Sequence, residues 1–265
     1  MKVSTSHVIS GPVNGYGTWS LYLKEVRRFL KVPAQTLLAP AASALLMLAI
    51  FSLALGGAVR VVAGVPFIEF LAPGLVMMAM IQASFANTSS GLVMAKIQGN
   101  IVDLLMSPLT PAEITLGLTL GGITRGAVTG VVLVIVMQPF ATLAPQHPGY
   151  VVFHAVGASM ALSLVGMLGG IWAEKFDHIA AVTNFVVTPL AFLSGTFYSV
   201  ERLPGVWHAV SQFNPVFYMI DGFRYGFIGV ADGSLATGFA VVIGLNLCLL
   251  FACHRLLASG YKLKA

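Results

Sequence analysis

The sequence predicts an all-α polytopic membrane protein with six transmembrane helices. Hydrophobic residues make up 57% of the 265 residues and charged residues only 9%, which leaves too little polar surface to cover a soluble globule of this size. The mean hydropathy is +0.90. Six apolar runs are each long enough to cross roughly 30 Å of hydrocarbon at about 1.5 Å per residue. We therefore expect residues 1–265 to form a single transmembrane domain, with an N-terminal interfacial helix and short external re-entrant helices before the last span.

Residues 17–32 predict an amphipathic helix at the membrane surface. On a helical wheel of about 100° per residue, apolar and polar side chains separate, with Leu21 as the exception. The apolar side holds Trp19, Tyr22, Leu23, Val26, Phe29 and Leu30, and the polar side holds Ser20, Lys24, Arg27, Arg28 and Lys31. Such a helix can place its rings among lipid headgroups and its cations toward the cytoplasm. Packing on protein is the alternative, and both can hold at once.

The spans and their orientation follow from hydropathy and from the basic residues. The spans are predicted over residues 34–59, 67–94, 114–137, 150–172, 179–199 and 235–257. Short loops rich in Lys and Arg are retained in the cytoplasm. With both termini cytoplasmic, the inner segments hold Lys2, Lys24, Arg27, Arg28, Lys31, Lys96, Lys175, Arg255, Lys262 and Lys264, and the outer segments hold Arg60, Arg202 and Arg224. This asymmetry predicts that both termini lie in the cytoplasm.

The loop between the second and third spans, residues 96–111, predicts a short cytoplasmic helix that Pro108 ends. Ile101, Leu104 and Leu105 form one apolar face of this helix. A plain interfacial turn would show the same pattern.

The third span combines small residues with an arginine. Its glycines, Gly117, Gly121, Gly122, Gly126 and Gly130, are typical of close helix packing in lipid. Arg125 lies on the face of Gly121 and is predicted to point at protein. Because a central Arg costs about 2.5 to 3.5 kcal/mol on insertion scales, it is a functional candidate. Structural pairing or snorkelling is the favoured role, and a direct part in the conduction path is the alternative.

The external segment, residues 200–234, is too long and too aromatic for a simple turn, and its prolines divide it into pieces too short to cross a bilayer. We predict re-entrant or interfacial helices with rings at the outer headgroups. The rings are Trp207, Phe213, Phe217, Tyr218, Phe223, Tyr225 and Phe227. The polar Asn214, Asp221 and Arg224 then need water or partners. The i, i+3 spacing of Asp221 and Arg224 predicts a local ion pair, and a substrate contact is the alternative.

Four blocks of the sequence occur in a characteristic order. They are LAPGLVMM at 71–78, NIVDLLMSPLTP at 100–111, TPLAFLSGTFYS at 188–199 and the aromatic stretch at 201–229, which contains Asn214-Pro215, Tyr218-Met219-Ile220 and GFRYGF at 222–227. Together they closely resemble the permease subunits of ABC-2 type exporters, over almost the whole chain.

The resemblance implies a permease in the cell inner (plasma) membrane, working as a homodimer with two ABC ATP-binding subunits that bind the ATP. It implies that the helix at 17–32 frames the docking cleft of the ATPase, and that a coupling helix contacts it through Gly99, Asn100, Ile101, Asp103, Leu104 and Leu105. It also implies that the external segment, with Asn214, Pro215, Tyr218, Asp221 and Arg224, dips into the outer leaflet.

Other functional classes find less support. The sequence contains no G-x-x-x-x-G-K-[ST] motif and no H-E-x-x-H motif, so we predict no nucleotide site, cofactor or metal in this chain and no enzyme activity of its own. Its basic residues flank apolar spans, which argues against nucleic-acid binding. A secondary transporter or channel without ATP is the main alternative, although no inverted repeat is recognisable. A lipid-directed membrane enzyme lacks convergent acid, base or metal residues. Aromatic rings concentrated outside the spans favour a small amphipathic or lipid-like cargo.

Overall fold

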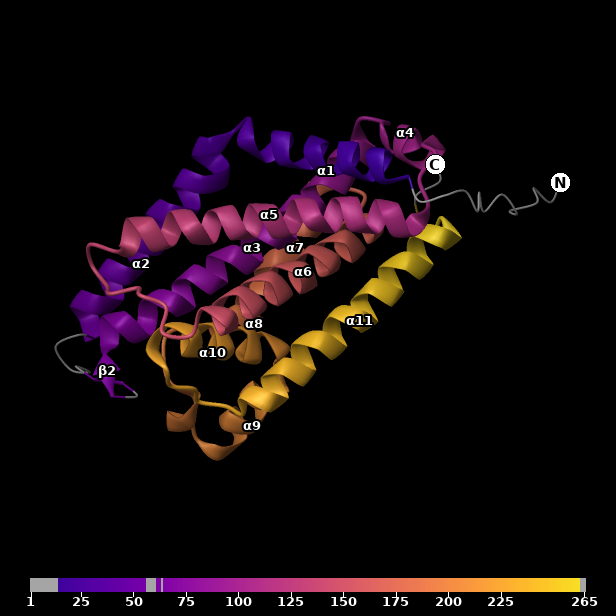
Figure 1. Ribbon diagram of the computed structural model, residues 1–265. Helices are drawn as coiled ribbons and strands as arrows, with labels where there is room; N and C mark the ends of the chain where they lie inside the picture. The colour runs from indigo at the N-terminus through magenta and orange to yellow at the C-terminus, as the bar shows by residue number, and fades with distance from the viewer. Residues whose placement is uncertain (1–13, 56–60, 63, 263–265) are drawn as a thin grey trace.

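The computed structural model describes residues 14–55, 61–62 and 64–262, and these residues are mostly helical (Figure 1). Lys2, Arg60 and Lys264 of the charge count and the predicted end of the first span at Val59 lie outside the described residues. The helices are α1 (Gly15–Leu30), η1 (Ala34–Leu38), α2 (Ala39–Leu55), α3 (Phe67–Ile97), α4 (Ile101–Met106), α5 (Pro111–Met137), α6 (Pro148–Trp172), α7 (Phe176–Val182), η2 (Thr183–Val187), α8 (Thr188–Phe192), η3 (Val200–Arg202), α9 (Gly205–Phe213), α10 (Pro215–Ile228) and α11 (Leu235–Ser259). The short strands β1 (Val61–Val62) and β2 (Val65–Pro66) pair antiparallel.

Within the described residues, five helices are long and apolar enough to span a membrane. They cover Ala34–Ala54, Phe67–Ile97, Pro111–Met137, Pro148–Trp172 and Leu235–Ser259, which agree with five of the six predicted runs. The predicted span at 179–199 corresponds instead to a shorter apolar helix, Phe176–Phe192, made of α7, η2 and α8. The all-helical membrane fold is thus confirmed, and the sixth span stays a prediction.

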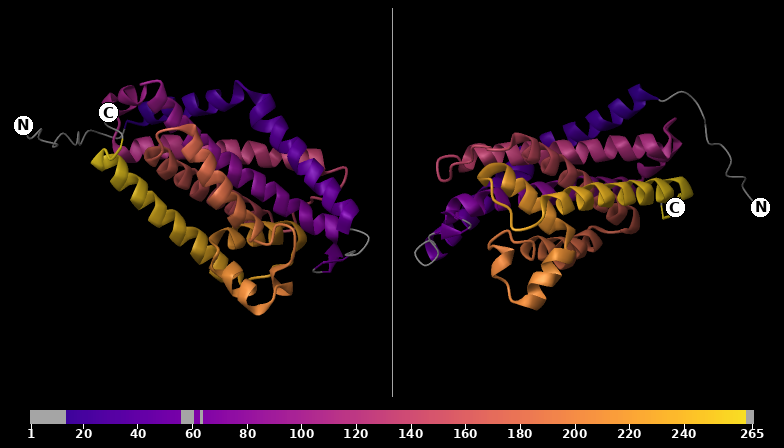
Figure 2. Two further views of the ribbon diagram at one scale, coloured as in Figure 1. Left: turned by 180° about the vertical axis from the view of Figure 1, so that it is seen from behind. Right: turned by 60° about the horizontal axis from the view of Figure 1, so that its bottom comes forward.

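The bundle is built around α3. About 72% of the apolar window of α3 is buried, against 17% for the helix Ala34–Ala54, which joins η1 and α2, and 17% for α11. Helices α5, α6 and α10 pack on α3, while α2 and α11 lie on opposite flanks (Figures 1 and 2). Glycines on α5 make the close packing possible: Gly122 and Gly126 lie directly against Ser163 and Ser84 of the neighbouring helices. The predicted role of these glycines in helix packing is confirmed.

Two of the helices widen into π turns, and proline is the local reason. Pro40 follows η1 and Pro189 follows η2. Since proline has no N–H, Pro40 cannot donate to the carbonyl of Thr36, and Pro189 cannot donate to that of Phe185. Helices bend and π turns form where the regular i→i−4 backbone hydrogen bonds are interrupted in this way.

Helix α1 packs on the bundle along one side and is exposed along the other. Leu21, the exception on the helical wheel, is only 7% exposed and contacts Gly117 of α5. Phe29 is buried, whereas Trp19 and Leu30 remain about half exposed. Protein packing therefore holds for one face of α1, and the exposed ring of Trp19 leaves the interfacial interpretation open for the other.

The segment at 200–234 forms two helices of different character. Helix α9 is exposed, and its Trp207 and Phe213 are 55% and 89% exposed. Helix α10 packs among α3, α6 and α11. The prediction that all seven rings lie at the headgroups is wrong for Phe217, Phe223 and Phe227, which are buried at 5% exposure or less, because α10 enters the bundle instead of lying on it.

Candidate functional site

Several segments meet at one end of the bundle, which we call the α4 end (Figure 1). Asn14, just before α1, donates from its amide nitrogen to the carbonyl of Pro108, at 3.3 Å, in the connection after α4. Lys96, at the end of α3, donates to the carbonyls of Ile171 and Ala173 at the end of α6. These contacts place the start of α1, α4 and the α6–α7 connection together.

Helix α4 turns its predicted contact face inward. Gly99, with a φ of +76°, reverses the chain after α3, and α4 begins at Ile101. Ile101 is 6% exposed, and Leu104 and Leu105 pack with it against the apolar cluster under α4. Ile101 is therefore buried in the bundle, whereas Leu104 and Leu105 are only partly buried, and the contact of these three side chains with an ATPase stays a prediction.

The opposite face of α4 is open. Val102 is 52% exposed and Met106 is 80% exposed, and Asp103 is exposed beside them. Of the six predicted coupling residues, Asp103 lies on this exposed face and the exposed loop residues Gly99 and Asn100 lead into it, while Leu104 and Leu105 keep part of their surface free. Sequence analysis missed Val102 and Met106, since its helical wheel could not tell which apolar face the bundle uses.

The connection after α4 is held to the start of α1. Thr110 and Glu113 form a capping box at the start of α5. The Glu113 carboxylate also accepts from the backbone N–H of Asn14 at 2.5 Å, and the N–H of Thr110 donates to it at 2.7 Å. With the Thr110 hydroxyl, which donates to it at 2.9 Å, this carboxylate accepts from three donors and joins α1, the α4–α5 connection and α5.

A second polar contact joins α1 to α3. Arg28 donates to the carboxylate of Glu25 at 2.5 Å and to the carbonyl of Asn87 at 2.6 Å. The side-chain amide of Asn87 donates to the same carboxylate at 3.3 Å. Glu25 is 5% exposed. The sequence prediction did not include Glu25, although its i, i+3 spacing from Arg28 was an available signal.

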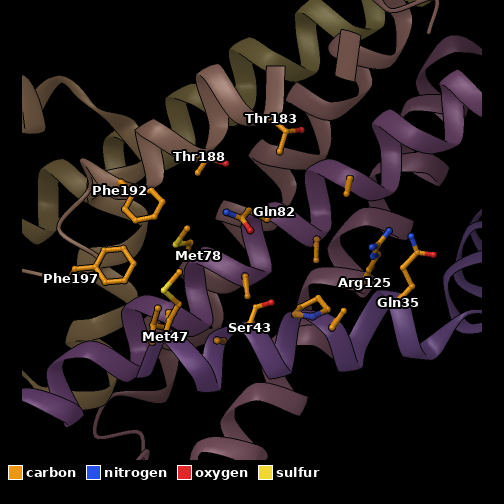
Figure 3. Close-up of a pocket in the computed structure, with 17 residues that line it drawn as sticks. Gln35, Ser43, Met47, Met78, Gln82, Arg125, Thr183, Thr188, Phe192 and Phe197 are labelled. Atoms are coloured by element: carbon orange, nitrogen blue, oxygen red, sulfur yellow. The ribbon is translucent and has the colours of Figure 1, made fainter. Parts of the chain in front are cut away.

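Arg125 borders a cavity of about 580 Å³ between η1 and α2, α3, α5, and the helix formed by η2 and α8 (Figure 3). The side chain is half-buried, and its Nε is buried without a hydrogen-bond partner among the described residues. Its predicted direction toward protein agrees with this position between helices, and its orientation relative to lipid stays a prediction. The predicted pairing partner is not found within residues 14–55, 61–62 and 64–262.

Arg224 is held inside the bundle by backbone carbonyls. It is 1% exposed, and it donates to the carbonyl of Phe70 at 3.2 Å and to that of Gly195 at 2.6 Å. Its guanidinium carbon lies 3.9 Å from the centroid of the Phe70 ring, a cation–π distance. These contacts fasten α10 to α3 and to the turn at Gly195.

Asp221 does not pair with Arg224, so the predicted ion pair is wrong. Its carboxylate accepts from the backbone N–H groups of Asp232 and Gly233 at 2.9 and 3.0 Å. The described salt bridges join other residues. Burial raises the pKa of Asp221, against the opposing effect of these hydrogen bonds. The i, i+3 spacing failed as a guide because the two side chains point to different loops.

Asn214 and Pro215 start α10. The Asn214 side chain accepts from the N–H of Val216 at 3.0 Å, and its amide donates to the carbonyl of Leu190 at 2.7 Å. Pro215 occupies the first helical turn, where its missing N–H costs nothing. Tyr218 is half-buried and packs on the ring of Phe217. The predicted external residues are therefore a structural unit that anchors α10.

Comparisons with known proteins agree with this architecture. Residues 16–228 match the family described as ABC-2 type transporter. The chain is 35% identical to the inner membrane transport permease YadH of Escherichia coli (strain K12), over 93% of this chain and 96% of that protein. It is 24% identical to nodulation protein J of Rhizobium meliloti (strain 1021), over 82% and 84% of the two chains. The nodulation protein J of Neorhizobium galegae is 27% identical over 89% and 90%. The chain belongs to the ABC-2 type transporter family.

Proposed function

We propose that this chain is the permease subunit of an ATP-driven exporter, and that a separate ATP-binding subunit docks on the exposed face of α4. Membership of the ABC-2 type transporter family supports a transport permease. The similarity to a protein described as an inner membrane transport permease supports a location in the cell inner membrane. The observation that carries the docking proposal is the division of α4 into a buried face and an open face.

The open face of α4 suits a protein partner. Val102 and Met106 place apolar area outside the bundle, next to the charge of Asp103. Met is flexible and polarisable, and it adapts to the groove of a partner. Because Ile101 is buried in the bundle, we infer that a force applied to Val102 and Met106 is passed to the helices under α4.

The contacts of α1 offer a path from α4 to the transmembrane helices. The Asn14 contacts join the start of α1 to the connection after α4. The contacts of Arg28 and Glu25 join α1 to α3, the helix that precedes α4 in the chain. At the other end of α1, the hydroxyl of Thr36 in η1 donates to the carbonyl of Phe29 at 2.9 Å. We infer that movement of α4 shifts α1, η1 and α2 together. Such a change requires a ligand that binds one conformation more tightly than the other, and nucleotide bound to the partner subunit supplies this difference.

We further propose six membrane crossings with both termini in the cytoplasm. The helix Phe176–Phe192 starts beside the α6–α7 connection at the α4 end. At its other end Phe192 stacks on Phe197, which stacks on Phe51 near the end of α2. Reporters fused after Gly99 and after Ala265 are expected to read cytoplasmic, and one within 146–149 external. An external C-terminus would contradict this topology.

The docking proposal is tested by changing the open face of α4. Val102→Glu and Met106→Glu are expected to leave the amount of permease in the membrane unchanged, because both side chains are exposed. They should abolish co-purification with the ATP-binding subunit and stimulation of its ATP hydrolysis, since each buries an unpaired charge in the contact. Val206→Glu is the matched control, because Val206 on α9 is 77% exposed at the other end of the molecule.

The outcomes separate the competing functions. If both α4 variants still bind the ATPase and export, the contact lies elsewhere. If the native permease transports in vesicles without any ATPase or ATP, it is a secondary transporter or channel. The same purified complex tests the stoichiometry, for which we propose two copies of this chain, in contact with membrane lipid, and two ATP-binding subunits.

A further inference from the structure

The cavity beside Arg125 lies between helices on the half-exposed flank of the bundle. Helix α2 contributes Met47, and the helix Phe176–Phe192 contributes Phe192. These two side chains are 39% and 38% exposed, so the cavity is open to molecules in the surrounding membrane. Its volume of about 580 Å³ lies within the range of small-molecule sites.

The charge in this cavity is not balanced. Among the described residues that line it, Arg125 is the ionic group, and no carboxylate lies within 4.0 Å of it. The charged side chain near enough to act on Arg125 is another cation, Arg28, whose own charge is met by Glu25 at 2.5 Å. A cation in an apolar environment is stable only when an anion or strong acceptors approach it. No anion among the described residues occupies the position beside Arg125.

The polarity of the cavity is graded along its length. In Figure 3, Arg125 and Gln35 lie side by side at one end, and Phe192 and Phe197 lie at the other, next to Met47. Within the described residues, the side chains of Gln35 and Arg125 donate no hydrogen bond to protein. The cavity thus presents free donors at one end and aromatic and thioether surface at the other.

Both π turns of the described chain open onto this cavity. Gln35 belongs to η1 and Thr183 belongs to η2, and both residues line it. Turns of this kind are frequent at functional sites, because the extra residue moves side chains out of the regular helical position. Although Pro40 and Pro189 account for the two turns, the turns direct Gln35 and Thr183 from separate helices into one cavity.

We propose that this cavity binds an amphiphile with a single anionic group as the transported cargo, its anion on Arg125 and its apolar part against Met47, Phe192 and Phe197. The assignment as cargo rests on the proposed function, whereas binding itself does not require the ATPase. Gln35 donates further hydrogen bonds to the anion. The apolar part makes van der Waals contacts with the rings and the thioether at the aromatic end.

Binding is measured on the purified full-length permease in nanodiscs of phosphatidylcholine, which carries no net charge. The fluorescent probe is dansyl-undecanoic acid. Wild-type permease should bind it, dodecyl phosphate should displace it, and dodecanol or inorganic phosphate alone should be weaker competitors by about tenfold or more. Equal competition by dodecanol would overturn the role of the anion, and equal competition by inorganic phosphate would overturn the role of the apolar part.

The variants place the ligand in this cavity. Arg125→Gln should lower the affinity for the probe by about tenfold or more, and Arg125→Lys should lower it less, because the charge remains. Arg255→Gln is the matched control: Arg255 is exposed on α11 and lies over the ring of Phe251 at 5.1 Å. Unchanged affinity in Arg125→Gln would overturn the proposal, as would cross-linking of Ser43→Cys between two copies that excludes the probe, since a second copy would then fill the cavity.

A transport assay distinguishes a transported cargo from a lipid that only stays bound in the cavity. In vesicles that contain the permease and its ATPase, ATP should drive movement of the probe in wild type but not in Arg125→Gln, while stimulated ATP hydrolysis continues. Binding without ATP-driven movement, in a complex whose ATPase is stimulated, would overturn the assignment as cargo. The docking proposal is tested separately: it predicts that Val102→Glu loses transport and still binds the probe with unchanged affinity, and retained transport in this variant would overturn it without affecting the binding proposal.

Discussion

Two arginines lie within the apolar bundle, and their surroundings differ in every respect. Arg224 is 1% exposed, donates to two carbonyls and lies on the ring of Phe70. Arg125 is half-buried beside a cavity and has no acceptor among the described residues. The comparison teaches that a cation serving the fold is satisfied by the fold itself. A cation that faces a cavity without a protein acceptor is free to bind a ligand.

The largest expected effect is on stability, at Arg224. Arg224→Ala should lower the free energy of unfolding by about 3 kcal/mol, because two buried carbonyls lose their donor and a cavity forms beside Phe70. Arg224→Lys should lose less, although an ammonium group cannot reproduce the fork and the stacking. The measurement is unfolding in detergent, with the exposed Arg202→Ala as control. If Arg224→Ala unfolds like the wild type, the contrast between the two arginines disappears.

The next effect is expected at Asp221, which fixes the connection between α10 and α11. Asp221→Ala should destabilise the protein by about 2 kcal/mol, because two backbone N–H groups lose their acceptor. Asp221→Asn should cost less, since one oxygen can still accept. Hydrogen exchange should become faster at the amides of Asp232 and Gly233. Asp177→Ala, on the exposed surface of α7, should change neither quantity. Unchanged exchange at both amides would show that the loop is held by other contacts.

A smaller effect is expected where α1 meets α3. Glu25→Gln should destabilise the protein by about 1 kcal/mol, because the charge-assisted hydrogen bond from Arg28 becomes a neutral one while Arg28 keeps partial contact with water. A double-mutant cycle with Arg28→Gln should show coupling between the two positions. Additive effects would mean that this ion pair does not hold α1 on α3.

The smallest effect on stability is expected at Arg125, and it sharpens the comparison most. Arg125→Leu should change the free energy of unfolding by less than about 0.5 kcal/mol or stabilise the protein, since no hydrogen bond within the described chain is lost and a charge leaves an apolar environment. Transport should nevertheless fall. A loss of stability as large as that of Arg224→Ala would show that Arg125 has a structural partner.

Much of the fold could be predicted because its signals are local. Hydropathy placed the helices that begin at Phe67 and Pro148 to within a few residues, and Asn214-Pro215 marked a real boundary. Local signals also have a limit. The apolar face of α4 was real, but hydrophobicity alone does not say whether Ile101 contacts its own bundle or a partner.

Composition, apolar periodicity and helix-breaking residues determined by themselves that this chain is a helical membrane protein, and four motif blocks indicated its family. Only the tertiary structure decided which residues meet. Arg224 and Phe70 are 154 positions apart, and Arg125 shares a cavity with residues of three other helical segments. Helix propensity and hydropathy depend on residues within one turn or one span. The partner of a buried charge depends instead on how separate helices pack, and the periodicity of a single segment does not contain that information.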